Sequence, residues 1–130
     1  MGNIKKLPDA EFEVMKVIWH SEIPIVGNTI VEKLELDTQK VWKLQTVHKL
    51  LSRLEERGFL QSDKNGKQRF FTPLVAEEDY LQYEAQNFVK SHYQGSLLNL
   101  VNAMYQGENL AEKELDELQE WLNERGKRDE

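Results

Sequence analysis

The chain has 130 residues, the length of one ordinary domain or of two small modules, and it contains no cysteine. This excludes disulfide scaffolds, thiolate metal sites and cysteine nucleophiles. Hydrophobic residues make up 39% and charged residues 31% of the chain, and the apolar residues recur at helical spacing, which excludes wholesale disorder. No apolar run approaches the roughly 18 residues of a membrane span, and the N-terminus has no signal-peptide core. We therefore expect a soluble, cytoplasmic protein.

The net charge of −6 is unevenly distributed. Residues 1–74 carry 12 Lys and Arg against 10 Asp and Glu, whereas residues 75–130 carry 5 against 13. Residues 40–69 alone hold 8 basic and 3 acidic side chains. Because surface charges more than about 8–10 Å apart are largely screened at physiological salt, a partner responds to this local field rather than to the total. We expect two domains, residues 1–74 and residues 75–130.

Two helices are predicted near the N-terminus. The first runs from Pro8 to His20, with proline in the first turn and apolar residues over more than half of its circumference. A short extended link at Ile23–Ile25 separates it from a second helix, roughly Val26–Leu34. Such a first helix belongs at the centre of a small helical bundle.

The most informative predicted helix covers Trp42–Arg57. At about 100° per residue it has one apolar side and one polar side. The apolar side contains Leu44, Val47, Leu50, Leu51 and Leu54. The polar side contains Trp42, Gln45, Thr46, Lys49, Ser52 and Arg53. Gly58 supplies a left-handed stop. Trp42 has a second interpretation, because tryptophan packs more often than it reads bases, and it would then close the core against the second helix.

A β-hairpin follows between Phe59 and Leu74, and it is the only convincing β signal in the chain. Its turn is Asn65-Gly66, the strongest two-residue hairpin signal, and Lys64, Lys67 and Arg69 place positive charge near its tip. Because an isolated hairpin is marginally stable, it must lean on the preceding helices.

Three helices followed by a basic hairpin predict a winged helix-turn-helix in a fold that is mainly α. The major groove, about 12 Å wide, accepts one helix whose N-terminal residues meet base edges. We expect Gln45 to pair with adenine, Lys49 with guanine, and the hairpin to follow the backbone. The predicted DNA-contacting residues are Lys43, Gln45, Thr46, Lys49, Ser52 and Arg53 of the helix and Lys64, Lys67 and Arg69 of the hairpin.

The remaining sequence predicts three amphipathic helices, at Glu77–Tyr93, around Leu97–Met104 with a stop at Gly107, and at Ala111–Asn123. They carry more apolar surface than they can cover alone, which predicts a homodimer reading a pseudo-palindromic operator. The predicted dimerisation residues are Leu81, Phe88, Val89, Leu97, Leu100, Val101, Met104, Leu115, Leu118 and Leu122.

Two segments, Asp9–Trp19 and Thr46–Leu54 with Gly58 after it, closely resemble the penicillinase repressor family. That family contains the β-lactamase, methicillin-resistance and copper-responsive repressors. The resemblance covers nearly the whole chain and is weaker beyond Pro73. It implies a homodimeric transcriptional repressor whose winged helix binds an operator, whose C-terminal helices dimerise, and which an inducing signal releases.

The chain departs from this family in two places. Copper-responsive members end in a cysteine-rich metal motif, which this chain lacks, so we expect no metal and no cofactor. β-Lactam-responsive members are cleaved by a regulatory protease at an Asn-Phe bond after a Leu-Val pair. Here Leu100-Val101 is followed by Asn102-Ala103-Met104, and the Asn-Phe pair is at Asn87-Phe88. Cleavage near Ala103 is a hypothesis from position alone.

Two other classes of function compete with a repressor. An enzyme is disfavoured because His20, His48 and His92 are scattered, and no metalloprotease motif, nucleophile elbow or glycine-rich phosphate loop occurs. The alternative is a winged-helix module whose basic face binds an acidic protein. The salt dependence of affinity distinguishes this module from a repressor, because DNA binding through several phosphates weakens steeply with ionic strength.

Overall fold

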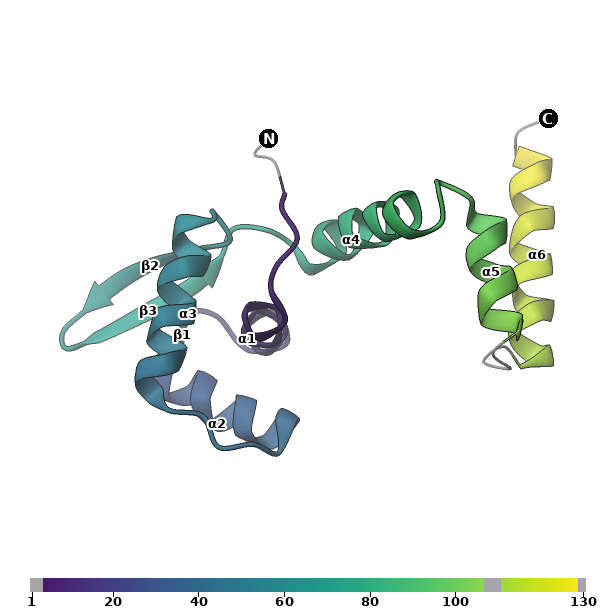
Figure 1. The fold of residues 1–130 in the computed structure, drawn as a ribbon. Coiled ribbons are helices and arrows are strands. Elements are labelled where there is room, and N and C mark those ends of the chain that lie inside the picture. Colours follow the sequence, from purple (N-terminus) through teal and green to yellow (C-terminus); the bar gives the residue numbers. More distant parts are fainter. Residues whose placement is uncertain (1–3, 107–110, 129–130) are drawn as a thin grey trace. The chain divides into compact units, whose positions relative to one another are not determined.

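The computed structural model describes residues 4–106 and 111–128, in which the chain forms six helices and three strands (Figure 1). The elements are α1 (Asp9–Trp19), β1 (Ile25–Val26), α2 (Gly27–Thr38), α3 (Leu44–Glu56), β2 (Leu60–Asn65), β3 (Gln68–Pro73), α4 (Glu77–His92), α5 (Leu97–Gln106) and α6 (Glu112–Arg128). None of the helices in these residues is long and apolar enough to cross a membrane. The predicted fold, mainly helical with a small hairpin, is confirmed.

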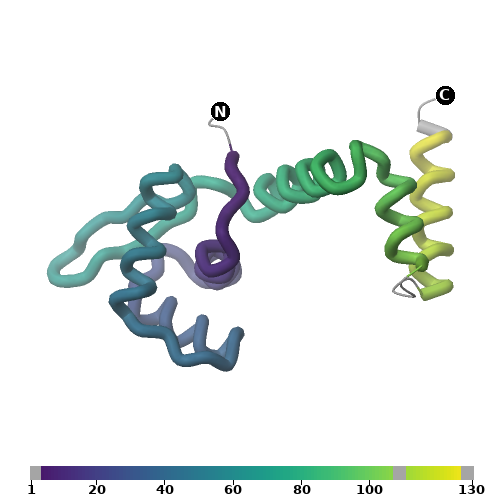
Figure 2. Tube along the Cα trace, in the orientation of Figure 1, coloured from purple at the N-terminus to yellow at the C-terminus, as the bar shows by residue number. Residues whose placement is uncertain are grey.

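Helices α1, α2 and α3 lie together (Figure 2), and they pack around the core of the first of two compact units, which ends at Glu84. Val14, Met15 and Ile18 of α1 are fully buried, as the apolar spacing of that helix predicts. Ile30 and Leu34 of α2 are also fully buried. Helix α1 contacts both α2 and α3, and five of its eleven residues are buried, as its wide apolar face predicts.

Helix α3 turns one side to this core through Val47, Leu50, Leu51 and Leu54. Leu44 falls on the same predicted apolar side, but its side chain is 42% exposed. Leu44 is the first residue of α3, one turn before Val47, which is the first buried residue of the helix. The predicted stop is confirmed: Gly58 has a φ of +83°, and the Phe59 amide donates to the Leu54 carbonyl at 2.9 Å.

The sheet has three antiparallel strands in the order β1-β3-β2, one more than the predicted hairpin. Ile25 pairs with Phe71 and Val26 with Phe70, so the last residue of the predicted extended link and the first residue of the predicted second helix form an edge strand. The hairpin turn lies one residue later than predicted. Asn65 pairs with Gln68, which leaves Gly66, with a φ of +67°, and Lys67 as the two loop residues.

The first unit ends after Glu84 rather than at the predicted boundary after Leu74. The reason is Tyr80 in α4, whose side chain is fully buried. Its hydroxyl oxygen accepts a hydrogen bond from the Leu7 amide at 2.8 Å, and its ring lies 5.6 Å from that of Phe59. The first turns of α4 therefore complete the core of the N-terminal domain.

The ends of the other helices differ modestly from the predicted ones. Helix α2 continues beyond the predicted Leu34 to Thr38, and Gln39 then ends it with a φ of 56°. Helix α6 runs to Arg128, beyond the predicted end at Asn123. The predicted stop at Gly107 lies outside the described residues.

Candidate nucleic-acid interface

The polar side of α3 is free of packing against the rest of its unit. Gln45, Thr46, Lys49, Ser52 and Arg53 are all exposed. The opposite side is anchored by four buried aliphatic side chains, so the orientation of the helix is set by the core. The result is a helix whose exposed side is polar over residues 45–53, with Leu44 exposed at its first position.

The head of α3 begins later than predicted, because Trp42 and Lys43 precede the helix. Lys43 is the extended N-cap residue and is exposed. The Trp42 amide donates to Glu35 Oε2 at 2.9 Å, and its indole Nε1 donates to Thr38 Oγ1 at 2.8 Å. Trp42 therefore packs on α2, which confirms the second interpretation of this residue. These bonds fix the position of the first turn of α3.

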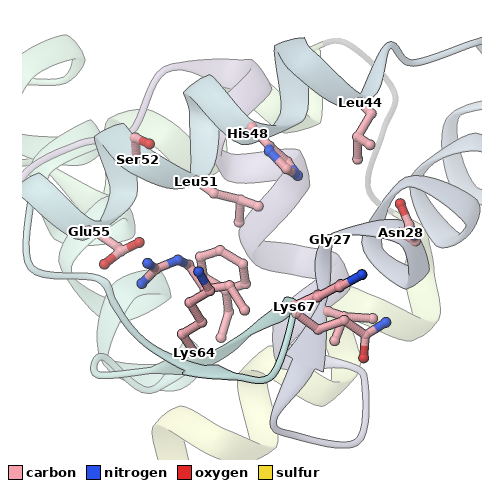
Figure 3. Close-up of a pocket in the computed structure, with 13 residues that line it drawn as sticks. Gly27, Asn28, Leu44, His48, Leu51, Ser52, Glu55, Lys64 and Lys67 are labelled. Carbon is pink, nitrogen blue, oxygen red and sulfur yellow. The ribbon is translucent and has the colours of Figure 1, made fainter.

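A groove of about 620 Å³ separates α3 from the hairpin (Figure 3), and we call it the wing groove. The side chains that line it are Val26, Asn28, Leu44, His48, Leu51, Ser52, Glu55, Lys64, Lys67, Gln68, Arg69 and Phe71, together with Gly27. Four predicted DNA contacts, Ser52 and the three hairpin cations, thus border one cavity. Lys43, Gln45, Thr46, Lys49 and Arg53 lie outside it.

Two groove residues that sequence reasoning missed are Glu55 and His48. Ser62 Oγ donates to Glu55 Oε2 at 3.0 Å and accepts from Arg69 Nη1 at 2.8 Å. The imidazole of His48 lies against the first residue of α2, since a Cβ built on Gly27 would stand 3.1 Å from His48 Nε2. Helical phase alone places His48 on the boundary between the apolar and polar sides of α3, and no sequence pattern links Glu55 to the strands that follow it.

One cation of residues 40–69, Arg57, already forms an ion pair within the protein. Arg57 Nε donates to Glu11 Oε1 at 2.8 Å, and the Glu11 side chain is only 1% exposed. Arg57 therefore compensates a buried carboxylate and contributes little to the outward field of residues 40–69. The exposed cations of α3 and the hairpin remain to attract a partner.

A second histidine, His20, follows the end of α1 and lies beside a carboxylate. Its Nε2 lies 2.9 Å from Glu77 Oε2, at the start of α4. Among residues 4–106 and 111–128, no group of three or more His, Asp and Glu side chains is arranged to hold a metal ion. His20 therefore connects α1 to α4 within the first unit.

A three-helix core, a polar third helix and a basic antiparallel hairpin packed beside it define a winged helix-turn-helix protein. The family model described as Penicillinase repressor matches residues 7–124, and the chain belongs to this family. The resemblance found in the first and third helices is confirmed. The family consists of transcriptional repressors, so the chain is a repressor and not an enzyme.

Two curated relatives match nearly the full chain, and a solved structure matches about three fifths of it. The penicillinase repressor of Bacillus licheniformis is 35% identical over 125 residues, which cover 95% of this chain and 94% of that protein. The methicillin resistance regulatory protein MecI of Staphylococcus aureus (strain N315) is 32% identical over 120 residues, which cover 92% and 95%. The solution structure of the DNA-binding domain of the repressor BlaI is 36% identical with a TM-score of 0.51, covering 62% of this chain and 94% of that one.

Proposed function

We propose that the chain represses transcription as a homodimer, in which each α3 enters the major groove of operator DNA and each hairpin follows the adjacent backbone. The observation that carries this proposal is the exposure of all nine predicted contact residues, five of which lie on a helix whose opposite side is buried. The similarity to a domain whose title names it as DNA-binding supports the same assignment.

The nine residues divide into two roles. Lys43, Gln45, Thr46 and Lys49 lie at the head of α3, which is the part of such a helix that reaches base edges. Ser52 and Arg53 follow one turn later, and Lys64, Lys67 and Arg69 belong to the hairpin. These later residues suit phosphate contacts, which fix the position of the protein but carry no sequence information.

Selection of bound duplexes from random-sequence DNA by the full-length chain tests this proposal. We expect a two-fold symmetric motif and a binding constant that falls with salt at a log–log slope of about −0.9 per phosphate contact. Lys49→Ala should change the selected motif, whereas Lys67→Ala should weaken binding to all duplexes and make the slope shallower by about one. Binding only to an acidic protein, with no selected motif, would contradict the proposal.

The second unit supports dimerisation because its apolar residues lack cover within one chain. No residue of α5 is buried, and Leu97 and Leu98 are 55% and 75% exposed. None of the ten predicted dimerisation residues is buried, although Leu81 falls within the first unit rather than the second. Exposed apolar surface of this kind marks an interaction site.

The dimer is tested by the molar mass of the chain in solution. We expect Leu97→Glu to halve the mass measured by light scattering, because a charge would then have to be buried in the interface. Leu36→Glu is the matched control, since Leu36 is 78% exposed in α2 of the first unit. A parent chain that is monomeric at micromolar concentration would refute the dimer.

The inducing signal in this proposal is proteolysis within the C-terminal unit. The Asn102-Ala103-Met104 segment is exposed but helical in α5, so a protease would need local opening of that helix to bind it in extended form. Asn87-Phe88 lies inside α4 and needs the same opening. Incubation with the cognate protease and mass spectrometry of the fragments identifies the bond, and an intact chain under inducing conditions rejects this mode of release.

A further inference from the structure

Glu55 is a carboxylate in a groove that otherwise suits a polyanion. It is half-buried and borders the wing groove together with Lys64 and Lys67 (Figure 3), and Arg69 also lines this groove. A carboxylate at this place repels any phosphate that approaches the groove. The Glu55 carboxylate therefore weakens DNA binding by electrostatic repulsion. Its hydrogen-bond partners indicate what offsets this cost.

The contacts of Glu55 lead across the hairpin to a cation. The Ser62 hydroxyl donates to Glu55 Oε2 at 3.0 Å, and Arg69 Nη1 donates to Ser62 Oγ at 2.8 Å. Ser62 pairs with Phe71 and Lys64 pairs with Arg69, so alternation places Ser62 and Arg69 on the same face of the hairpin. The three residues form a chain from α3 through β2 to β3, which we call the relay.

The chemistry of the serine explains why the relay needs its acid. A hydroxyl has one hydrogen to donate and two lone pairs that accept, and its hydrogen rotates freely unless an acceptor holds it. The Glu55 carboxylate holds that hydrogen, which turns the lone pairs toward Arg69. A guanidinium has five N–H donors, and one bond to Ser62 leaves the others for an external anion.

We propose that Glu55 and Ser62 are positioning residues for DNA binding, which hold the Arg69 guanidinium in the wing groove before a backbone phosphate arrives. A free arginine side chain loses much rotamer freedom when it is fixed on a phosphate, and the relay removes most of that loss beforehand. The relay also ties the hairpin to α3, so both elements meet the duplex in a fixed relation. This inference rests on the proposed function.

The sign of one substitution distinguishes the relay from plain electrostatics. Removing a carboxylate from a phosphate-binding groove tightens DNA binding if charge alone matters. The relay predicts the opposite for Glu55→Ala, a weakening of about threefold to tenfold, because Arg69 is no longer held. Glu56→Ala is the matched control, since Glu56 is the adjacent exposed carboxylate outside the relay, and it should tighten binding by about twofold or less.

The experiment measures the dissociation constants of full-length variants for the tightest duplex recovered by selection, at one salt concentration. We expect Glu55→Ala to weaken binding in the parent background but not in the Arg69→Ala background, where it should act like Glu56→Ala. Ser62→Ala should show the same dependence on Arg69, with Gln61→Ala on the same strand as its control. Melting temperatures verify that each variant is folded, and Ser62→Ala decides the question if Glu55→Ala does not fold.

Two results would overturn the relay while the proposed function stands. One is tightening by Glu55→Ala equal to that of Glu56→Ala in the parent background. The other is an equal weakening by Glu55→Ala with and without Arg69, which indicates general structural damage instead of positioning. A parent chain that binds no duplex would overturn the proposed function itself, so the two failures are distinguishable.

Discussion

Tyr80 joins the start of α4 to the core of the winged domain, and its hydroxyl offers a sharp test of that packing. The side chain is fully buried, and its ring lies 5.6 Å from the ring of Phe12 and 5.8 Å from that of Trp19. The hydroxyl oxygen accepts the Leu7 amide hydrogen at 2.8 Å. Tyr80→Phe preserves the aromatic packing and removes only this acceptor.

The expected loss follows from the group left behind. Without the hydroxyl, the amide of Leu7, a residue that is 2% exposed, has lost its acceptor in a buried site. A buried donor without a partner costs about 1–3 kcal/mol. We therefore expect Tyr80→Phe to lower the free energy of unfolding by this amount at neutral pH.

The size of this loss depends on pH in a defined direction. Burial raises the pKa of the Tyr80 phenol above its ordinary value of 10.0, the Leu7 hydrogen bond lowers it by less, and Glu84 and Tyr83 raise it further. The pKa of Tyr80 is higher in the folded chain than in the unfolded chain. The contribution of its hydroxyl to the free energy of unfolding is therefore complete below pH 10 and declines as the pH rises toward the folded pKa. The decline is about 1.4 kcal/mol per pH unit in that window.

Urea unfolding of the parent chain and the variant, at one protein concentration from neutral pH to about pH 11, measures both effects. The stability difference should be largest near neutrality and shrink above pH 10. Tyr105→Phe is the control, since Tyr105 is 55% exposed and should change stability little at any pH. A difference that is absent at neutral pH, or one that stays constant up to pH 11, would refute the reasoning.

Two further predictions concern the same domain. Arg57→Ala leaves the buried Glu11 carboxylate without its 2.8 Å partner, and should cost about 2–3 kcal/mol, below the 3–5 of a fully buried pair because Arg57 stays 36% exposed. Chemical denaturation measures this, and Arg53→Ala on the exposed side of α3 should cost less than about 0.5 kcal/mol. In calorimetry, a fragment ending at Glu84 should show a cooperative unfolding transition, whereas a fragment ending at Leu74 should show none. Equal midpoints for the two fragments would contradict the boundary.

Most of the winged domain was predictable because its signals are local. The phase of the aliphatic residues in α3 decides which side is buried, and Gly58 decides where the helix ends. The hairpin is predicted by the residues of its own turn. The predicted turn is wrong by one position, because both Asn65-Gly66 and Gly66-Lys67 place a glycine in a two-residue loop. The exposure of Lys49 and Arg53 follows from the same phase, so the candidate interface could be predicted together with the fold.

Other features required contacts between distant segments. Strand β1 has two residues, too few for any periodicity, and it exists only because β3 offers it an edge. The relay needs Glu55 and Arg69 on elements that meet only after the hairpin packs on α3.

The amino-acid sequence thus determined the family, the order of the elements and the polar side of α3, since periodicity, glycine stops and turn residues act within a few positions of themselves. Tertiary structure alone decided where the first domain ends, because the hydroxyl of Tyr80 meets a backbone amide 73 residues away. It also decided which charges are paired within the protein, because Arg57 meets a buried acid of α1. Hydrogen bonds and ion pairs depend on the distance between two residues in space, and local sequence patterns do not give that distance for residues far apart in the chain.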